Sequence, residues 1–271
     1  MRVLFVGNSY TLYHDVPAQV AAIAASLGRA SFEGRRGQPP TSVEGRRGQP
    51  PTSVEDRRGQ PPTSVEDRRG QPPTSVEDRR GQPPTIEPHS VLQGGADWKL
   101  HRDALGTPAR IAEGFDAVVL QGKSTDPLLA RFAFARHGAA LACLARRHGA
   151  RVIFEQTWAW AADHPSYRDR WTRGSPEAWA AHVRRAYARL ALVTSAEIAP
   201  VGDAWLRALR QAPSLDLHDA DRHHASPIGA HLAALVLVTT LARVDVRHAT
   251  WRPSEVPEDV ARTLRAIAAT T

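Results

Sequence analysis

Short apolar runs alternate with helical patterns along nearly the whole chain, and this alternation most constrains the fold. Five apolar runs predict strands, at residues 3–6, 89–92, 115–121, 151–155 and 197–201. Helical patterns lie at residues 15–27, 96–104, 108–113, 126–148, 176–193, 203–211, 227–241 and 257–268. Strands that alternate with helices are typical of βαβ units, whose strands are parallel. We therefore predict one α/β domain over residues 1–271, a three-layer α/β/α sandwich with a parallel sheet of about five strands.

A repeated unit interrupts this pattern between the first helix and the second strand. From Gly34 the unit GRRGQPPTSVE recurs with a period of 11 residues, and a last partial copy begins at Asp78. Each copy has one Val as its only large apolar residue, and Pro-Pro excludes helix, so the copies cannot bury enough surface to fold. We predict a disordered, partly polyproline-II insertion at residues 34–86 that the host fold tolerates. A docking arm rich in Arg and Pro is the alternative.

Composition excludes several classes of protein. The single cysteine, Cys143, rules out an internal disulfide and a cysteine-based metal site. The net charge is +7, but the arginines are scattered among acidic residues along helical stretches, so we expect no nucleic-acid partner. No apolar run reaches the ~20 residues that span a bilayer, and the first residues show no charged-then-apolar leader pattern before the first predicted strand. We therefore expect no membrane partner and a cytoplasmic location.

The first predicted strand ends in Gly7-Asn8-Ser9, which puts a hydroxyl at the carboxyl end of that strand. Ligands of open α/β sheets bind at this edge. A serine there, backed by the amides of a strand-to-helix turn, suits a nucleophile. The same turn is also explained as a cap of the next helix. The nucleophile hypothesis therefore needs a base and an acid from elsewhere in the chain.

The segment DLHDADRHHASPIG, near the C-terminal end, supplies both groups. Asp221 and His224 are three residues apart, so the carboxylate can orient the imidazole while Nε2 remains free for Ser9. Asp219 is the alternative acid, and His223, which we expect to face solvent, is the neighbour most easily mistaken for the base. These two aspartates and two histidines could instead bind a metal ion, but further ligands would be needed, and we predict no metal.

Two of these segments resemble the sequence blocks of SGNH (GDSL-like) hydrolases. The stretch Gly7 to Thr11 resembles the first block in its Gly-Asn-Ser form, and Asp221 to Gly229 resembles the last block, Asp-x-x-His-x-Ser. Gly94-Gly95 resembles the second block. The resemblance covers the chain except for the insertion at 34–86, and it implies an SGNH or flavodoxin-like sheet.

The resemblance also implies roles for single residues. Ser9 would be the nucleophile, His224 the base and Asp221 its orienting acid. The backbone amides of Ser9 and Gly95 would form part of the oxyanion hole.

The third block departs from the pattern of the family, in which an Asn donates a hydrogen bond to the oxyanion. This chain has Gln121-Gly122-Lys123-Ser124 instead. The side-chain amide of Gln121 could donate, and Gln121 resembles a variant of carbohydrate-esterase-like members. Ser124, where the Asn would fall, is the alternative, and we favour Gln121. Loss of one oxyanion donor typically costs ~10²–10³ in rate.

Together these features predict a serine hydrolase that acts on a small-molecule acyl ester and uses no cofactor. An acetyl group on a sugar is a candidate substrate. A thioesterase or lipase on the same triad is one alternative, and a hydrolase-like binding module is another. Trp158, Trp160 and Trp171, with His164, either line a sugar-binding cleft or pack in the interior, and we favour packing.

Overall fold

The computed structural model describes residues 1–33 and 84–271. Within these ranges it describes all side chains except those of residues 28–33. Most of the predicted insertion therefore lies outside the described residues. The described part contains one sheet of five parallel strands in the order β2-β1-β3-β4-β5. The strands are β1 (Arg2–Gly7), β2 (Glu87–Leu92), β3 (Ala117–Gln121), β4 (Arg151–Glu155) and β5 (Glu197–Ala199). The predicted α/β class and parallel sheet are confirmed.

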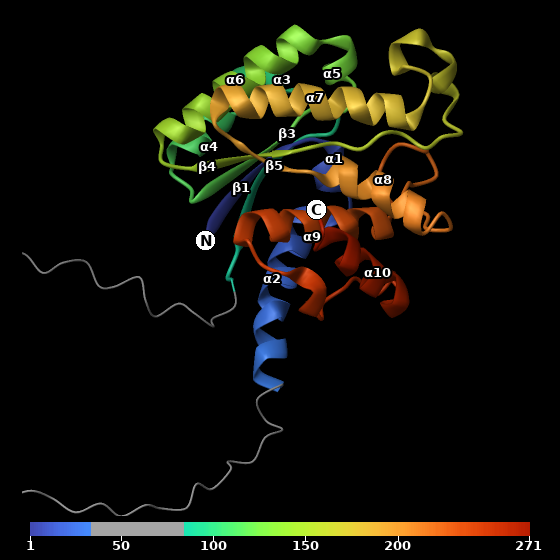
Figure 1. Ribbon diagram of the computed structural model, residues 1–271. Coiled ribbons are helices and arrows are strands. Elements are labelled where there is room, and N and C mark those ends of the chain that lie inside the picture. Colours follow the sequence, from blue (N-terminus) through green and yellow to red (C-terminus); the bar gives the residue numbers. More distant parts are fainter. Residues whose placement is uncertain (34–83) are drawn as a thin grey trace, which may run out of the picture.

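Helices cover both faces of the sheet (Figure 1). On one side lie α2 (Val16–Glu33), α8 (Val201–Gln211), α9 (Pro227–Ala242) and α10 (Glu258–Ala268). On the other lie α3 (Trp98–Asp103), α4 (Thr107–Ala112), α6 (Arg131–Arg147) and α7 (Pro176–Thr194). The short helices are α1 (Ser9–Leu12), α5 (Asp126–Leu129), η1 (Tyr13–Asp15), η3 (Pro165–Arg168), η4 (Arg170–Thr172) and η5 (Val246–His248).

The central strand β1 shows why a continuous apolar run becomes a parallel strand. Val3 and Phe5 belong to the core on the α2 and α9 side, whereas Leu4 and Val6 belong to the core on the α6 and α7 side. All four side chains are fully buried. Alternate residues of a strand point to opposite faces, so a strand covered on both faces must be apolar at every position.

Two predicted helices differ from the observed ones by more than two residues at an end or by an internal break. The helix predicted at 15–27 begins at Val16 and continues to Glu33. Gly28 does not end it, since a single glycine costs a helix only ~1 kcal/mol. The helix predicted at 126–148 is divided at Ala130, whose φ of −132° and ψ of 39° are not helical, into α5 and α6. Side-chain periodicity continues across such a break, so the sequence pattern does not reveal it.

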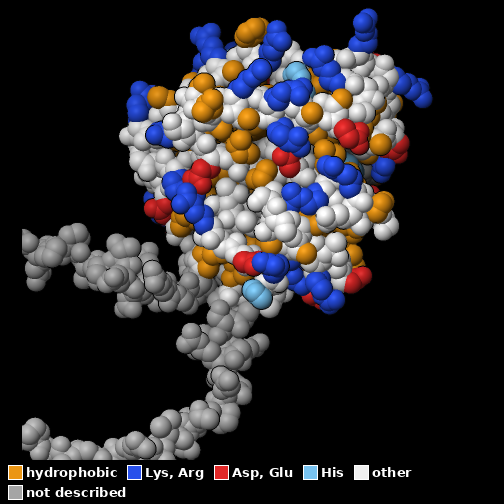
Figure 2. Space-filling view, viewed as in Figure 1, with side chains coloured by type: hydrophobic (Ala, Val, Ile, Leu, Met, Phe, Trp, Pro, Cys, Tyr) orange, Lys and Arg blue, Asp and Glu red, His pale blue; other side chains and the backbone are white. Residues whose placement is uncertain are grey.

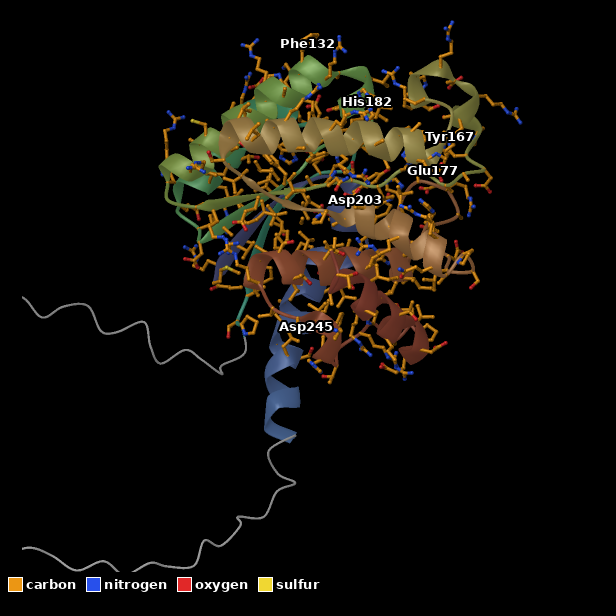
Figure 3. The ribbon with its side chains drawn as sticks, viewed as in Figure 1. Phe132, Tyr167, Glu177, His182, Asp203 and Asp245 are labelled. Carbon is orange, nitrogen blue, oxygen red and sulfur yellow. The ribbon has the colours of Figure 1, made fainter. Side chains whose placement is uncertain are left out.

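Charged side chains are mixed over the visible face of the molecule. Figure 2 shows Lys and Arg spread over this face with Asp and Glu between them. Some of these charges connect elements: Asp203 of α8, labelled in Figure 3, accepts from the Arg184 guanidinium of α7, with Nε 2.9 Å from both carboxylate oxygens. Among the described helices, none is both long and apolar enough to cross a membrane.

Candidate active site

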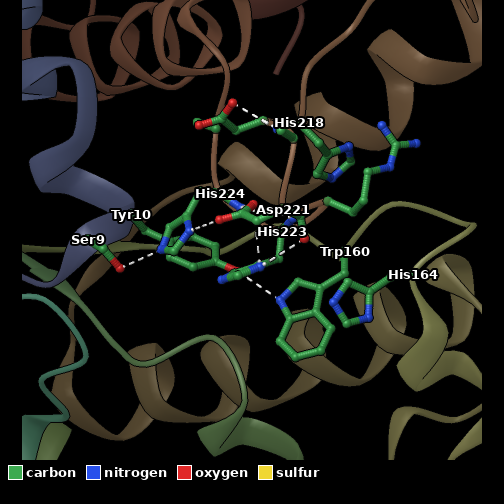
Figure 4. Close-up of polar contacts among 12 residues, drawn as sticks. Ser9, Tyr10, Trp160, His164, His218, Asp221, His223 and His224 are labelled. Carbon is green, nitrogen blue, oxygen red and sulfur yellow. Dashed lines mark hydrogen bonds and ion pairs between the residues drawn. The ribbon is translucent and has the colours of Figure 1, made fainter.

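The three side chains predicted to form a catalytic triad, those of Ser9, Asp221 and His224, lie together at the carboxyl edge of the sheet (Figure 4). His224 Nε2 is 2.8 Å from Ser9 Oγ, and His224 Nδ1 is 2.5 Å from Asp221 Oδ2. Ser9 is 8% exposed, and the side chains of His224 and Asp221 are 13% and 41% exposed. A proton on Nδ1 that is donated to the carboxylate leaves Nε2 as an acceptor for the serine hydroxyl.

The turn after β1 fixes Ser9 at the first position of α1. Asn8 caps this helix, because its Oδ1 accepts a hydrogen bond from Tyr10 N at 3.1 Å. The Asn8 side chain also donates from Nδ2 to Ala96 O, at 3.0 Å, in the loop after β2. The backbone N–H of Asn8 donates to Gln121 Oε1 of β3, at 2.8 Å. Asn8 therefore ties together the ends of three neighbouring strands.

The loop that carries Asp221 and His224 is closed by backbone hydrogen bonds. Asp219 N donates to His224 O, and Ser226 N donates to Leu217 O, each at 2.9 Å. Trp158 Nε1 donates a hydrogen bond to the carbonyl oxygen of His223, at 3.1 Å. The loop then ends at Ser226, whose Oγ caps α9 by accepting from Gly229 N. The Ser-Pro start of α9 thus anchors the loop directly after its histidine.

The carboxylate of Asp221, and not that of Asp219, contacts the imidazole. Asp221 Oδ1 accepts from the amides of His223 and His224, at 3.0 and 2.9 Å. Partial burial raises the Asp221 pKa, but hydrogen bonds from the His224 ring and from these two amides outweigh burial and hold that pKa well below its ordinary value. The group is therefore an anion at neutral pH. Asp219 Oδ1 accepts from the neighbouring Ala220 N instead.

The predicted oxyanion residues occupy the ends of neighbouring strands. Gly95 lies in a turn closed by a hydrogen bond from Ala96 N to Gln93 O, is exposed, and has a φ of +71°, which favours glycine. Gln121 is 1% exposed, and its Nε2 donates to its neighbour's carbonyl, Gly122 O. Its Oε1 faces the Ser9 turn. Both ends of the Gln121 side-chain amide thus have hydrogen-bond partners within the protein. Ser124 is also buried, with 5% of its surface exposed.

The tryptophans divide into two environments. Trp158 is fully buried and stacks on Trp205, with ring centroids 4.2 Å apart, so it packs in the interior. Trp160 is only half-buried, and its ring centroid lies 4.3 Å from that of His164 and 5.4 Å from that of His223. Its Nε1 donates to Tyr10 OH at 2.8 Å. The aromatic group beside the triad therefore centres on Trp160.

The His223 ring lies against the His224 ring at a tilt of 41° rather than pointing freely into solvent. Its ring centroid lies 4.1 Å from that of His224, and its side chain is 30% exposed. Potential ligand atoms of Asp221, His223 and His224 lie within 4.8 Å of one another, a spacing that a metal ion could bridge. The Asp221 and His224 atoms are already joined by their hydrogen bond, so a metal there would displace the contact that orients the imidazole.

One buried carboxyl next to the site was not selected from the sequence. Glu155, the last residue of β4, is fully buried, and its Oε2 is 2.9 Å from Thr11 Oγ1. Burial raises the pKa of Glu155 to about 7, and the Thr11 hydrogen bond opposes this only in part. A signal was present in RVIFE, because a carboxylate at the end of an otherwise apolar strand must lie at the sheet edge that binds ligands.

Comparison with known proteins gives structural matches only. No family model and no curated protein matches the sequence. A protein described as an SGNH hydrolase, from Slackia heliotrinireducens, aligns over 89% of this chain and 98% of its own, with 23% identity and a TM-score of 0.60. A DUF4886 family protein from Bacteroides uniformis aligns over 100% of this chain and 93% of its own, with 15% identity and a TM-score of 0.64.

A third match is a variant of an acetyl-xylooligosaccharide esterase from Geobacillus. It covers 89% of this chain and 92% of its own, with 13% identity and a TM-score of 0.50. At these identities the likeness concerns the fold. The chain thus has the α/β fold of SGNH and GDSL-like hydrolases, as the resemblance of its sequence blocks implies.

Proposed function

We propose that this protein is a serine acyl-ester hydrolase. The observation that carries the proposal is the continuous hydrogen-bond chain from Asp221 through His224 to Ser9, with distances of 2.5 and 2.8 Å. Residues more than two hundred positions apart meet in the order that general-base activation of a serine requires. The cap of α1 is Asn8, so helix capping does not account for the hydrogen bonds that join these three side chains.

In the proposed mechanism His224 Nε2 takes the proton from Ser9 Oγ as the oxygen attacks the ester carbonyl. The Asp221 anion stabilises the imidazolium that forms. The imidazolium then gives the proton to the departing alcohol, and an acyl-enzyme ester remains on Ser9. Water attacks this ester with His224 as base, which releases the carboxylic acid and restores the serine.

The oxyanion of each tetrahedral intermediate would be held by the amides of Ser9 and Gly95. Gln121 is the proposed third donor, because its Nε2 carries two hydrogens and Gly122 O accepts one of them. The Ser124 hydroxyl is the alternative donor. Donors of this kind stabilise the charge that develops in the transition state. Their loss should therefore lower the reaction rate rather than weaken binding of the substrate.

The proposed substrate is a small acyl ester, with a sugar acetate as the candidate to test first. Two observations support a sugar acetate. The half-buried indole of Trp160 lies beside the triad, and one structural match is with an acetyl-xylooligosaccharide esterase. Measuring kcat/KM for p-nitrophenyl esters of increasing acyl length and for acetylated sugars tests this choice. A preference for long acyl chains or thioesters would contradict it.

The test of the function itself uses p-nitrophenyl acetate and a fluorophosphonate probe. We expect hydrolysis by the full chain, and Ser9→Ala should lower kcat by about 10⁴-fold or more and abolish labelling. Ser90→Ala, a serine on the outer strand β2, serves as the matched control. Well-folded protein that neither hydrolyses esters nor reacts with the probe would refute the proposal and favour a binding module.

A further inference from the structure

Glu155 lies beneath the turn that carries Ser9 and takes no part in the proposed chemistry. Its side chain is fully buried at the end of β4, beside Gln121 of β3 in the strand register. Oε2 contacts Thr11 Oγ1 at 2.9 Å. Oε1 has no hydrogen-bond partner among the described residues. A buried carboxyl with an unpaired oxygen is costly, so its presence needs an explanation.

Hydrogen bonds lead from Glu155 to the backbone at the nucleophile. Thr11 Oγ1 is 3.3 Å from Gln121 Oε1, and this oxygen accepts the backbone N–H of Asn8 at 2.8 Å. Gly7 leaves room for this arrangement, because a Cβ there would lie only 2.7 Å from Gln121 Oε1. The network thus ends on the residue that immediately precedes Ser9.

The proton on Glu155 decides which way these hydrogen bonds run. A protonated carboxyl donates to Thr11 Oγ1, so the Thr11 hydroxyl is free to donate to Gln121 Oε1. An ionised carboxylate only accepts, so the Thr11 hydroxyl turns toward Glu155. The oxygens of Thr11 and Gln121 then face each other with no hydrogen between them. Gln121 Oε1 keeps only the hydrogen bond from the Asn8 amide.

We propose that Glu155 is a positioning residue whose protonated form holds the Asn8–Ser9 turn in its active arrangement through Thr11 and Gln121. This inference rests on the proposed esterase function. Ionisation of Glu155 is expected to loosen the turn and slow attack by Ser9, because small displacements of a nucleophile cost large factors in rate.

The surroundings of Glu155 allow this proton to be held near neutral pH. Burial raises its pKa to about 7, and no charged side chain of the described part of the chain contributes to that shift. Among the described residues, the phenol of Tyr187, on α7, interacts with Glu155, and burial raises the pKa of this phenol further above its ordinary value. Tyr187 OH accepts from Gly122 N at 3.3 Å and remains neutral. Glu155 is therefore the group of this network that titrates near pH 7.

The first experiment compares pH profiles of p-nitrophenyl acetate hydrolysis for the native protein and Glu155→Gln. Glutamine reproduces the donor of the protonated carboxyl and cannot ionise. We expect kcat of the native protein to fall by about tenfold as the pH rises from about 7 to 9, with KM little changed, and kcat of Glu155→Gln to show no such fall. An equal change of kcat between about pH 7 and 9 in the two proteins would overturn the inference.

The second experiment detects the ionisation of Glu155 at the Asn8 amide without measuring catalysis. In two-dimensional NMR the Asn8 amide resonance should titrate with an apparent pKa near 7 in the native protein and in Thr11→Ser, which keeps the hydroxyl. The titration should be absent in Glu155→Gln and in Thr11→Val. An Asn8 amide that does not titrate in folded native protein would overturn the inference, whether or not the protein hydrolyses esters. Titration without hydrolysis would refute the proposed function alone.

Discussion

At the scale of single residues, two aspartates of one loop offer a matched comparison. Asp221 contacts the His224 imidazole, whereas Asp219 contacts only the next backbone amide. Asp221→Asn should lower kcat by about 10⁴-fold, because the amide no longer favours the Nδ1–H tautomer or stabilises the imidazolium. Asp219→Asn should leave kcat within about twofold. Steady-state kinetics on p-nitrophenyl acetate measures both, and a larger loss in Asp219→Asn would reverse the assignment.

Glu155 also makes a prediction about stability. Its pKa is raised from 4.5 to about 7 in the folded protein, so between these values the folded state holds a proton that the unfolded state releases. Stability therefore decreases as the pH rises through this window, by on the order of 3 kcal/mol in total. Urea unfolding at pH 4.5 and 8 should show this decrease for the native protein relative to Glu155→Gln. Parallel pH dependences would contradict the burial of a protonated carboxyl.

Residues in local motifs could be predicted from the sequence, and residues defined by strand register could not. The Gly-Asn-Ser turn indicates Ser9, and the spacing of three residues indicates Asp221 and His224. The partnership of Thr11, Gln121 and Glu155 depends on how β3 and β4 align, which no local pattern records. The contacts of Gln121 with Asn8 and Thr11 are equally invisible to local patterns, because these partners lie after β1, more than 100 positions away in the chain.

At the scale of elements, the start of α9 controls the loop that carries the base. A Cβ at Gly229 would collide with Leu217 O and with the Trp205 ring. Gly229→Ala should therefore push α9 from the loop, destabilise the protein by about 1–3 kcal/mol and lower kcat. Gly94→Ala is the control for stability, because a Cβ there meets nothing within 4 Å. Thermal melts and kinetics measure the effects, and equal melting temperatures would show that the contact is easily relieved.

The elements themselves were predictable where apolar periodicity and caps agree. The strands ending at Gln121 and Glu155, and the helix beginning at Pro227, lie as predicted. The break at Ala130 was not predictable, because neither glycine nor proline marks it. Its backbone departs from helical angles between α5 and α6, both of which contact α7. Tertiary contacts can override local propensity in such cases.

At the scale of the whole molecule, the parallel sheet assembles the candidate site from distant segments. Turns after β1, β2 and β3, the end of β4 and the loop before α9 all meet at one edge, while both faces of the sheet are covered by helices. This arrangement leaves the connection between α2 and β2 outside the catalytic proposal. Changes in that connection should therefore affect the protein through chain entropy rather than through chemistry.

Replacing residues 34–83 by a Gly-Ser linker of about 12 residues tests this expectation. The shorter loop should raise stability by only about 1 kcal/mol, because closure entropy varies with the logarithm of length. Ester hydrolysis should remain within about twofold of the native rate. Extending the deletion through residue 86 provides the contrast, since Ile86 is 5% exposed in the core and Thr85 O accepts from the Met1 ammonium at 2.7 Å. That longer deletion should lower the melting temperature. Loss of hydrolysis in the shorter replacement, with folding intact, would mean that the repeats contribute to the active site.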